Sequence, residues 1–187
     1  INEPTLVLLS KILEAGHPTP EEFDAAFKPL MAMAPFELVD YVGIDVAAHG
    51  LEYFAQVLSP DYKPSEAMMS YLKINHLGKK TGRGFYDWSA GRPAIDLAKA
   101  TKEYDINQLI ALQVNEATKL LEEGVADDPK EIDLAMANGG GSPFGPFALA
   151  QGIGYPELVF KLGEIYKKFP LDIFKPTNTL KEGKIKL

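Results

Sequence analysis

The sequence predicts an all-α protein built from two tandem, related helical units. Apolar residues recur at helical spacing, capping residues and glycines mark helix ends, and a pattern from the first half of the 187 residues returns in the second. Strand signals are almost absent, and only the aromatic stretch RGFYDW (83–88) fits an extended edge. The expected units cover residues 1–100 and 101–174, followed by a polar tail or linker over 175–187.

The first unit is expected to open with a helix that ends at Gly16, because glycine is the usual residue after a helix C-terminus. Its apolar stripe consists of Leu6, Leu9, Ile12 and Leu13. Two further helices are expected, one over GLEYFAQVL (50–58) and one over SEAMMSYLKINHLG (65–78). The second of these would run from a Ser65 cap to a stop at Gly78.

The second unit is expected to open with a long amphipathic helix, whose stripe over four turns consists of Ile106, Ile110, Val114, Ala117 and Leu121. Its next segment repeats the first unit, since LLEEGVADDPKEIDLAM (120–136) follows the plan of ILEAGHPTPEEFDAAF (12–27). Thr19 and Asp128 are the predicted N-caps, each followed by proline at the first helical position and by glutamate at the capping-box position. Gly124 is the predicted counterpart of Gly16.

A second pair of segments also aligns, APFELVDYVGID (34–45) with GPFALAQGIGYP (145–156). Each places a Pro-Phe pair after a turn, which predicts a buried aromatic plug between two helices. The first segment has Ala34 where the second has Gly145, and its Pro-Phe pair follows the preceding helix more closely by two residues.

Composition excludes several classes of function. A formal charge of −7 argues against nucleic-acid binding. Cysteine is absent and the histidines His17, His49 and His76 are scattered, so no metal site is expected. No long apolar run or leader peptide is visible, which predicts a cytoplasmic protein without membrane spans. Ile1 at the start and the Lys-rich end suggest a piece of a longer polypeptide.

The stretch GKKTGRGFYDW (78–88) allows three interpretations: a phosphate-binding loop, a basic surface patch, or a turn that leads aromatic side chains into a core. It is not a P-loop, because Lys73 stands where that motif requires glycine. The glycine-rich NGGGSPFG (138–145) follows an expected helix rather than a strand, so a dinucleotide-binding role is not predicted for it.

These motifs together resemble the C-terminal helical domain of the L-3-hydroxyacyl-CoA dehydrogenases of fatty-acid β-oxidation. The resemblance covers residues 2–90 as a full copy and 105–165 as a shorter one. Tandem copies are similar to the multifunctional branch, in which the second copy replaces the partner subunit of a dimer and an enoyl-CoA hydratase domain is often fused. The resemblance implies an acyl-CoA substrate and NAD.

In that family NAD binds to a preceding Rossmann domain that also carries the catalytic His and Glu, and no such βαβ pattern is visible here. The isolated chain is therefore expected to be inactive. The resemblance implies an Asn at the start of the first helix that orients the catalytic His and the substrate oxygen. Asn2 is the first candidate and Asn107 the second, and both also suit a helix N-terminus without any chemistry.

The resemblance also implies that Lys80 approaches the phosphates of NAD. The alternative is that Lys79, Lys80 and Arg83 are solvated while Phe85, Tyr86 and Trp88 anchor the turn in a core. Two functions follow: the helical part of a 3-hydroxyacyl-CoA dehydrogenase, or a non-catalytic helical binding or assembly module on the same scaffold.

Overall fold

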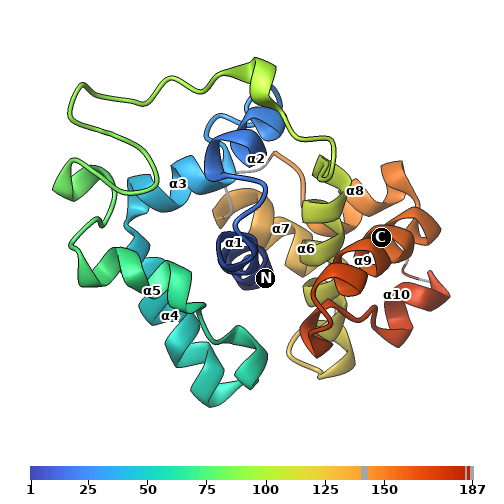
Figure 1. Cartoon of the computed structure of the whole chain (residues 1–187). Coiled ribbons are helices and arrows are strands. Elements are labelled where there is room, and N and C mark those ends of the chain that lie inside the picture. The colour runs from blue at the N-terminus through green and yellow to red at the C-terminus, as the bar shows by residue number, and fades with distance from the viewer. Residues whose placement is uncertain (140–142, 184, 186–187) are drawn as a thin grey trace. The chain divides into compact units, whose positions relative to one another are not determined.

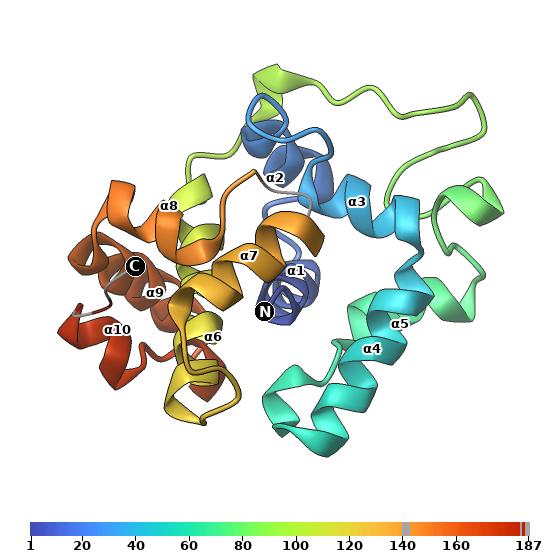
Figure 2. The same cartoon turned by 180° about the vertical axis from the view of Figure 1, so that it is seen from behind.

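The computed structural model describes residues 1–139, 143–183 and 185, and this part of the chain is helical (Figures 1 and 2). It contains no strand, only isolated bridges that pair Arg83 with Gly78 and with Asp87. The all-α prediction is therefore confirmed. The chain forms two compact units, one of residues Leu6–Asp105 and the other of Ile1–Thr5 with Ile106–Leu187. None of the described helices combines the length and the apolarity that spanning a bilayer requires.

The unit of residues 6–105 contains five α-helices and three short 3-10 helices among its described residues: α1 (Glu3–Ala15), α2 (Pro20–Phe27), α3 (Pro35–Val42), α4 (Ile44–Val57), η1 (Pro60–Tyr62), α5 (Glu66–Lys73), η2 (Lys79–Thr81) and η3 (Leu97–Lys99). Helix α1 ends at Gly16, which has a φ of 75°. Helix α2 begins with the predicted capping box of Thr19 and Glu22. Helices α4 and α5 lie side by side in both views (Figures 1 and 2).

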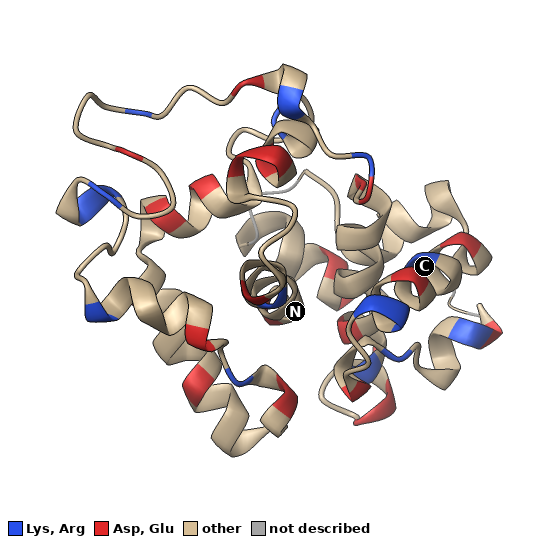
Figure 3. Cartoon of the chain, in the orientation of Figure 1, with Lys and Arg blue, Asp and Glu red and all other residues tan. Residues whose placement is uncertain are grey.

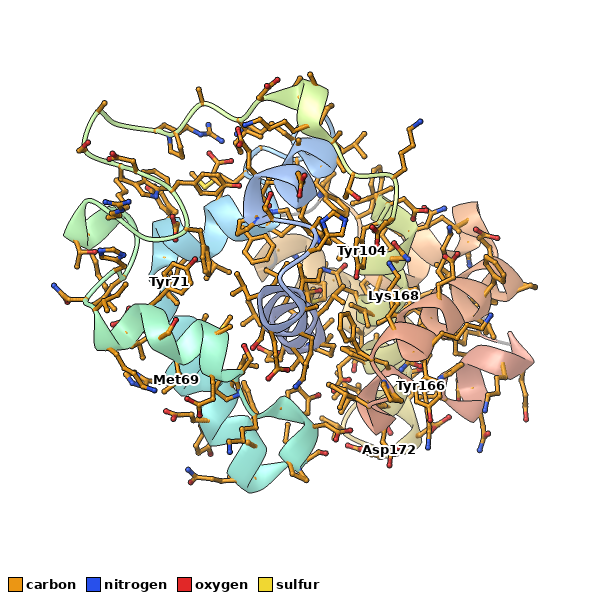
Figure 4. All side chains as sticks on the ribbon, in the orientation of Figure 1. Met69, Tyr71, Tyr104, Tyr166, Lys168 and Asp172 are labelled. Atoms are coloured by element: carbon orange, nitrogen blue, oxygen red, sulfur yellow. The ribbon has the colours of Figure 1, made fainter. Side chains whose placement is uncertain are left out.

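Aromatic side chains are a prominent part of the core of this unit. Phe23, Phe27 and Phe36 are fully buried, and the Phe23 ring stacks on Phe27 with centroids 4.6 Å apart. Tyr104, labelled in Figure 4, packs against Phe23 with centroids 5.1 Å apart. Aliphatic side chains fill the rest of this core, including the fully buried Leu8, Ile12 and Leu51, and burial of both kinds of side chain stabilises the unit.

Helix α5 is shorter than predicted. Ser65 caps it as expected, with its hydroxyl accepting a hydrogen bond from Met68 N at 3.2 Å. The helix ends at Lys73 instead of continuing to Gly78, because Asn75 adopts a φ of 55°. Asparagine tolerates this left-handed conformation better than most residues, so Asn75 can end the helix. The sequence-based prediction relied on glycine as the helix stop and therefore placed the end at Gly78.

The other unit contains the remaining described helices: α6 (Ile106–Glu122), α7 (Pro129–Gly139), α8 (Pro146–Ile153), α9 (Tyr155–Lys168), η4 (Asp172–Phe174) and α10 (Asn178–Glu182). The stripe predicted for α6 is confirmed at Val114 and Ala117, which are fully buried. Its other members, Ile106, Ile110 and Leu121, are half-buried, and the buried face also includes Leu109, Ala111 and Leu112. Residues 140–142 of the NGGGSPFG stretch lie outside the described residues. Asn138 and Gly139 are the last residues of α7, so the helix reaches into the stretch that was expected to follow it.

The segment expected to be a polar tail, 175–187, contains helix α10. Leu180 is fully buried there, and α10 packs against α6 and α9. Asn115 ties the segment down, because its amide donates to Lys175 O at 2.9 Å and its Oδ1 accepts from Thr177 N at 2.9 Å. Residues 178–182 of the expected polar tail or linker therefore form a helix that is attached by polar contacts and by one buried leucine.

The internal repeat is confirmed at the level of helix lengths. Helices α3 and α8 have 8 residues each, and α4 and α9 have 14 residues each. A glycine with positive φ separates the helices of each pair, Gly43 with 123° and Gly154 with 97°. Every position of α3 and α4 therefore has a counterpart in α8 and α9 at one constant offset.

Candidate functional site

The GKKTGRGFYDW loop wraps around one buried carboxylate, that of Asp40 in α3. Asp40 is fully buried and accepts hydrogen bonds from Phe85 N at 2.9 Å, Tyr86 N at 2.9 Å and Trp88 Nε1 at 2.8 Å. Three donors on one carboxylate fix the path of the loop over the helix. Burial raises the pKa of Asp40, and the hydrogen bonds from Trp88 and from the loop backbone oppose that rise.

Two glycines of this loop provide room for α3. A Cβ atom on Gly78 would lie 2.1 Å from Asp40 O, and one on Gly84 would lie 2.2 Å from Asp40 Oδ1. Gly78 also has a φ of 98°. These glycines therefore allow close packing against protein, which is a different role from cradling a phosphate.

The aromatic residues of the loop are packing residues, as one interpretation predicted. Phe85 lies edge-on to Phe36 with centroids 5.1 Å apart, and it meets Tyr71 of α5 at 4.9 Å (Figure 4). Trp88 is only 7% exposed and lies 6.3 Å from the ring of Tyr41. The loop is thus anchored by rings as well as by Asp40.

Lys80 belongs to η2, and its side chain reaches the first turn of α4, where it forms an ion pair with Asp45. Its Nζ is 2.5 Å from Asp45 Oδ1 and 2.7 Å from Oδ2, and its side chain is 45% exposed. The hydrogen bond from Lys80 lowers the pKa of Asp45. Gly43 makes space for this pair, because a Cβ atom there would lie 2.8 Å from Asp45 Oδ1 and 2.9 Å from Lys80 Nζ. The ammonium group is held in place but stays open to solvent on one side.

The neighbouring cations, Lys79 and Arg83, are not paired with a carboxylate in the contacts described. The Nζ of Lys79 lies 4.2 Å from the centroid of the Tyr41 ring, which is a cation–π arrangement. Arg83 is exposed. Of the three cations, Lys80 is the one that a carboxylate positions beside a helix N-terminus, where an anion is also favoured.

Asp24 of α2 forms a second buried hub. It accepts hydrogen bonds from Phe36 N at 2.8 Å, Glu37 N at 2.7 Å and the Tyr86 hydroxyl at 2.8 Å. The carboxylate therefore caps the N-terminus of α3 from the preceding helix, and Tyr86 connects the cap to the GKKTGRGFYDW loop. Burial raises the pKa of Asp24 to about 7, although its three hydrogen bonds act in the opposite direction.

Glu37 completes the charged cluster beneath the loop. Its fully buried side chain accepts hydrogen bonds from Lys28 Nζ at 2.6 Å and from Arg92 Nε. It also accepts from Ala34 N at 3.2 Å, which closes the first turn of α3. Burial raises the pKa of Glu37 and the hydrogen bonds from Arg92 and Lys28 lower it, with a net shift downward.

The second unit repeats the Asp24 hub. Asp133 of α7 accepts hydrogen bonds from Phe147 N at 2.8 Å and Ala148 N at 2.8 Å, as Asp24 does from Phe36 and Glu37. A Cβ atom on Gly145 would lie 2.3 Å from Asp133 Cα, which explains glycine at that position. Sequence analysis aligned Asp24 with Asp133 and the two Pro-Phe pairs, but it did not connect them. The aspartate at the same position of both repeats was the signal from which this cap could have been predicted.

The two candidate asparagines lie in the same compact unit, and Lys80 lies in the other. Asn2 precedes α1 and is exposed, and its Oδ1 accepts a hydrogen bond from Gln113 Nε2 at 2.9 Å. It also lies at the rim of a 340 Å³ cavity lined by Leu120, Ile132 and Met136. Asn107 lies in the first turn of α6 and is half-buried.

A His–carboxylate pair lies at the surface. His17 Nε2 lies 3.0 Å from Glu103 Oε1, and the His17 side chain is 64% exposed. Such exposure suits a surface contact that ties the segment after η3 to the turn before α2. Across the described residues, no group of three or more His, Asp or Glu side chains is arranged to hold a metal ion.

The ionisation of Asp24 should appear in the pH dependence of stability. In the unfolded chain an aspartate has a pKa near 4, whereas the pKa of Asp24 in the folded protein is about 7. Between these pH values Asp24 is therefore protonated in the folded state and ionised in the unfolded state. The contribution of Asp24 to the free energy of unfolding should therefore fall as the pH rises through this window, by at most about 1.4 kcal/mol per pH unit. Urea titrations between pH 4.5 and 7.5 on wild type and Asp24→Asn should show a steeper decline for wild type. Parallel curves would contradict the assignment.

The sequence is similar to proteins of known family. The family model described as 3-hydroxyacyl-CoA dehydrogenase, C-terminal domain, matches residues 1–88 and 104–182. The fatty acid oxidation complex subunit alpha of Vibrio campbellii is 29% identical over 182 residues, which is 90% of this chain and 24% of that protein. The subunit of the same name from Psychrobacter sp. is 33% identical over 134 residues, 59% of this chain and 18% of that protein.

A crystal structure of 3-hydroxybutyryl-CoA dehydrogenase from Escherichia coli K12 resembles the chain with a TM-score of 0.77. The two are 20% identical, and the match covers 92% of this chain and 56% of that one. At this identity the likeness shows the fold alone. The chain spans about a quarter of the length of the curated relatives it matches, 24% of the Vibrio campbellii protein.

Proposed function

This chain belongs to the family of 3-hydroxyacyl-CoA dehydrogenase C-terminal domains. We propose that it is the helical part of a longer polypeptide that oxidises (S)-3-hydroxyacyl-CoA to 3-ketoacyl-CoA with NAD. The observation that carries this proposal is the match of the family model to two successive segments, 1–88 and 104–182. The repeated caps of Asp24 and Asp133 support the view that the two segments are copies of one unit.

The residues present fit one edge of a dinucleotide site. Lys80 offers a half-exposed ammonium group beside the first turn of α4, which suits a pyrophosphate. The described residues contain no strand followed by a glycine-rich turn and a helix, so the rest of the site belongs to a Rossmann domain elsewhere in the polypeptide. NAD, when bound, supplies the hydride acceptor at its nicotinamide ring.

In this proposal the helical chain positions groups and does not carry the catalytic base. The hydride from C3 of the substrate would pass to the bound cofactor, and a base on the Rossmann domain would accept the hydroxyl proton. Asp40 and Asp24 hold the loop so that Lys80 faces the cofactor, and Asn2, or else Asn107, orients the reacting oxygen. We further propose a cytoplasmic location, a real or internal dimer of such units, and an enoyl-CoA hydratase domain in the longer polypeptide.

The test is an NAD-linked oxidation assay with 3-hydroxybutyryl-CoA on the longer polypeptide that contains this sequence. Lys80→Ala should raise the KM for NAD about tenfold, the effect of losing one hydrogen bond to a charged group. Asn2→Ala should lower kcat, and Asn107→Ala would do so instead if the second candidate has the role. Lys73→Ala removes a lysine that is 68% exposed and is the matched control. Unchanged kinetics in all variants would remove these residues from the site.

The second candidate function is a non-catalytic assembly module. It is favoured by the fact that packing explains most of the GKKTGRGFYDW loop, including its glycines and aromatics. The same assay separates the two functions. A longer polypeptide that folds, binds no NAD and shows no oxidation of 3-hydroxybutyryl-CoA supports the module, and NAD-dependent turnover excludes it.

A further inference from the structure

The second unit contains an apolar cavity beside α7. The cavity has a volume of 340 Å³, and its lining includes Leu120 of α6, Ile132 and Met136 of α7, and Ile1 at the N-terminus, which lies beside α7 (Figure 2). We call it the α7 cavity. All of its lining residues belong to one compact unit. Its volume falls within the range of small-molecule pockets in proteins.

The lining of the α7 cavity is aliphatic. Its apolar side chains are those of Ile1, Leu120, Ala126, Ile132, Ala135 and Met136. The polar side chains in the lining are those of Asn2 and Glu131, both exposed, and no basic residue is among the described residues that line it. In Figure 3 the last turns of α7 are tan, because residues 134–139 include no charged side chain. A neutral alkyl group therefore fits this cavity, whereas an anion would meet Glu131 without a compensating cation.

The internal repeat shows how the same helix packs when aromatic side chains of the protein fill its inner face. The counterparts of Ile132 and Met136 in the first unit are Phe23 and Phe27, which are fully buried and stack on each other. Phe23 also packs against Tyr104. The second unit therefore has smaller side chains where the first unit has an aromatic cluster. Because protein interiors are close-packed, a cavity at positions where the scaffold accepts large rings indicates space for a ligand.

Asn2 connects the α7 cavity to the proposed reaction. Asn2 lies at the rim of the cavity, and its Oδ1 accepts a hydrogen bond from Gln113 Nε2 at 2.9 Å. This bond fixes the carbonyl side of the amide and leaves its NH2 group as a donor for another oxygen. In the proposed function, that donor orients the oxygen on C3 of the substrate. The alkyl chain continues from C3, so it would begin at the rim of the α7 cavity.

The volume of the cavity limits the length of the chain. A cavity of about 150 Å³ can hold one benzene ring, so by proportion the α7 cavity has room for roughly ten carbon atoms. Each buried methylene group strengthens binding by about fourfold. Met136 is half-buried, and its flexible side chain can adapt to chains of different length.

We propose that the α7 cavity binds the alkyl chain of an acyl thioester substrate, and that Ile132 and Met136 set the chain length that is accepted. This inference rests on the proposed function for the identity of the substrate, and on Asn2 as the residue at the reacting oxygen. The accepted chains would extend up to roughly ten carbon atoms beyond C3.

NMR of methionine methyl groups tests binding without any turnover. The chain has five methionines, so isotope labelling gives few signals, and Met136→Leu identifies that of Met136. Octanoyl-pantetheine, a thioester without the nucleotide of CoA, should shift the Met136 signal. It should leave the signal of Met68 unchanged, because Met68 is fully buried in the other unit. Acetyl-pantetheine at the same concentration should shift neither signal. A Met136 signal that octanoyl-pantetheine does not move would overturn the proposal.

Ile132→Phe fills the cavity and keeps Met136 as the reporter. Phe23 at the counterpart position shows that the scaffold accommodates this ring, and circular dichroism checks that the variant is folded. The affinity for octanoyl-pantetheine should fall at least about tenfold, the effect of leaving two methylene groups unburied. Leu134→Phe is the matched control, because Leu134 lies on the same helix, is 66% exposed and does not line the cavity. Equal affinities of the two variants would exclude the α7 cavity as the site.

The chain-length preference of the longer polypeptide is the second test. Wild type should have a higher kcat/KM for 3-hydroxydecanoyl-CoA than for 3-hydroxybutyryl-CoA. Met136→Phe should lower the ratio of these two values at least about tenfold. A variant that only disturbs folding would lower both values and keep their ratio. An unchanged ratio in Met136→Phe would indicate that another part of the longer polypeptide covers the cavity, and it would overturn the proposal.

The two tests separate this inference from the function on which it rests. If octanoyl-pantetheine shifts the Met136 signal but the longer polypeptide oxidises neither substrate, the alkyl site stands and the dehydrogenase function fails. If both substrates are oxidised but the Met136 signal does not move, the dehydrogenase function stands and the α7 cavity is not the alkyl site.

Discussion

Replacing Asp40 with alanine is expected to lower the free energy of unfolding by about 3 kcal/mol or more. The variant leaves the N–H groups of Phe85, Tyr86 and Trp88 without their acceptor at a fully buried position. Each unpaired buried donor keeps its desolvation cost, and the cavity left by the carboxylate adds to it. Urea unfolding followed by circular dichroism and by the fluorescence of Trp88, the one tryptophan, measures the change.

The control for Asp40 is Asp87, a carboxylate of the same loop that is exposed. Asp87 accepts hydrogen bonds only within its own turn among the contacts described, from Ser89 N at 2.8 Å and from the Ser89 hydroxyl. Asp87→Ala should change stability by about 0.5 kcal/mol or less. Asp40→Asn should fall between the two, because an amide accepts hydrogen bonds through one oxygen only. Equal effects of Asp40→Ala and Asp87→Ala would contradict the buried-hub interpretation.

Gly78→Ala should destabilise the protein by about 3 kcal/mol, for a steric reason. The added methyl group would lie 2.1 Å from Asp40 O, a backbone atom of α3 that cannot rotate away. The φ of 98° adds strain for any residue with a Cβ atom. Thermal unfolding should register the loss as a lower Tm.

Gly82→Ala separates the two causes in Gly78→Ala. Gly82 also has a positive φ, 77°, but nothing lies within 4 Å of a Cβ atom built there. Its replacement should therefore cost only the conformational strain, about 1 kcal/mol. If both variants lose the same stability, then close packing against α3 is not what requires glycine at position 78.

The predicted helix ends that the structure confirms rest on residues close to those ends in the sequence. Thr19, Ser65 and Gly16 act within a few residues of their positions, so propensity and capping rules suffice to identify them. The repeat could also be found from sequence, because the capping residues and the Pro-Phe pair of the first unit recur in the second. The end of α5 was misplaced because Asn75 and glycine can fill the same backbone role.

The buried carboxylates could not be assigned from sequence, because their partners are distant along the chain. Asp40 bonds Tyr86 over 46 positions and Asp24 bonds Tyr86 over 62. An aspartate inside a helical pattern looks like a surface residue until those partners are known. The repeat gives a partial signal: Asp24 keeps an aspartate at its second-copy position, whereas Asp40 corresponds to the exposed Gln151, in a copy that lacks the GKKTGRGFYDW loop.

The chain passes twice between its two compact units, at Thr5–Leu6 and at Asp105–Ile106. A single proteolytic cut between Trp88 and Asp105 would divide the chain into an N-terminal and a C-terminal fragment. The two units would still be covalently linked, because the bond between Thr5 and Leu6 remains intact. A nicked protein should run as one species under native conditions and as two fragments in denaturing gels. The N-terminal fragment would retain residues 1–5, so exchanging that fragment between molecules would require the unit of residues 106–187 to open.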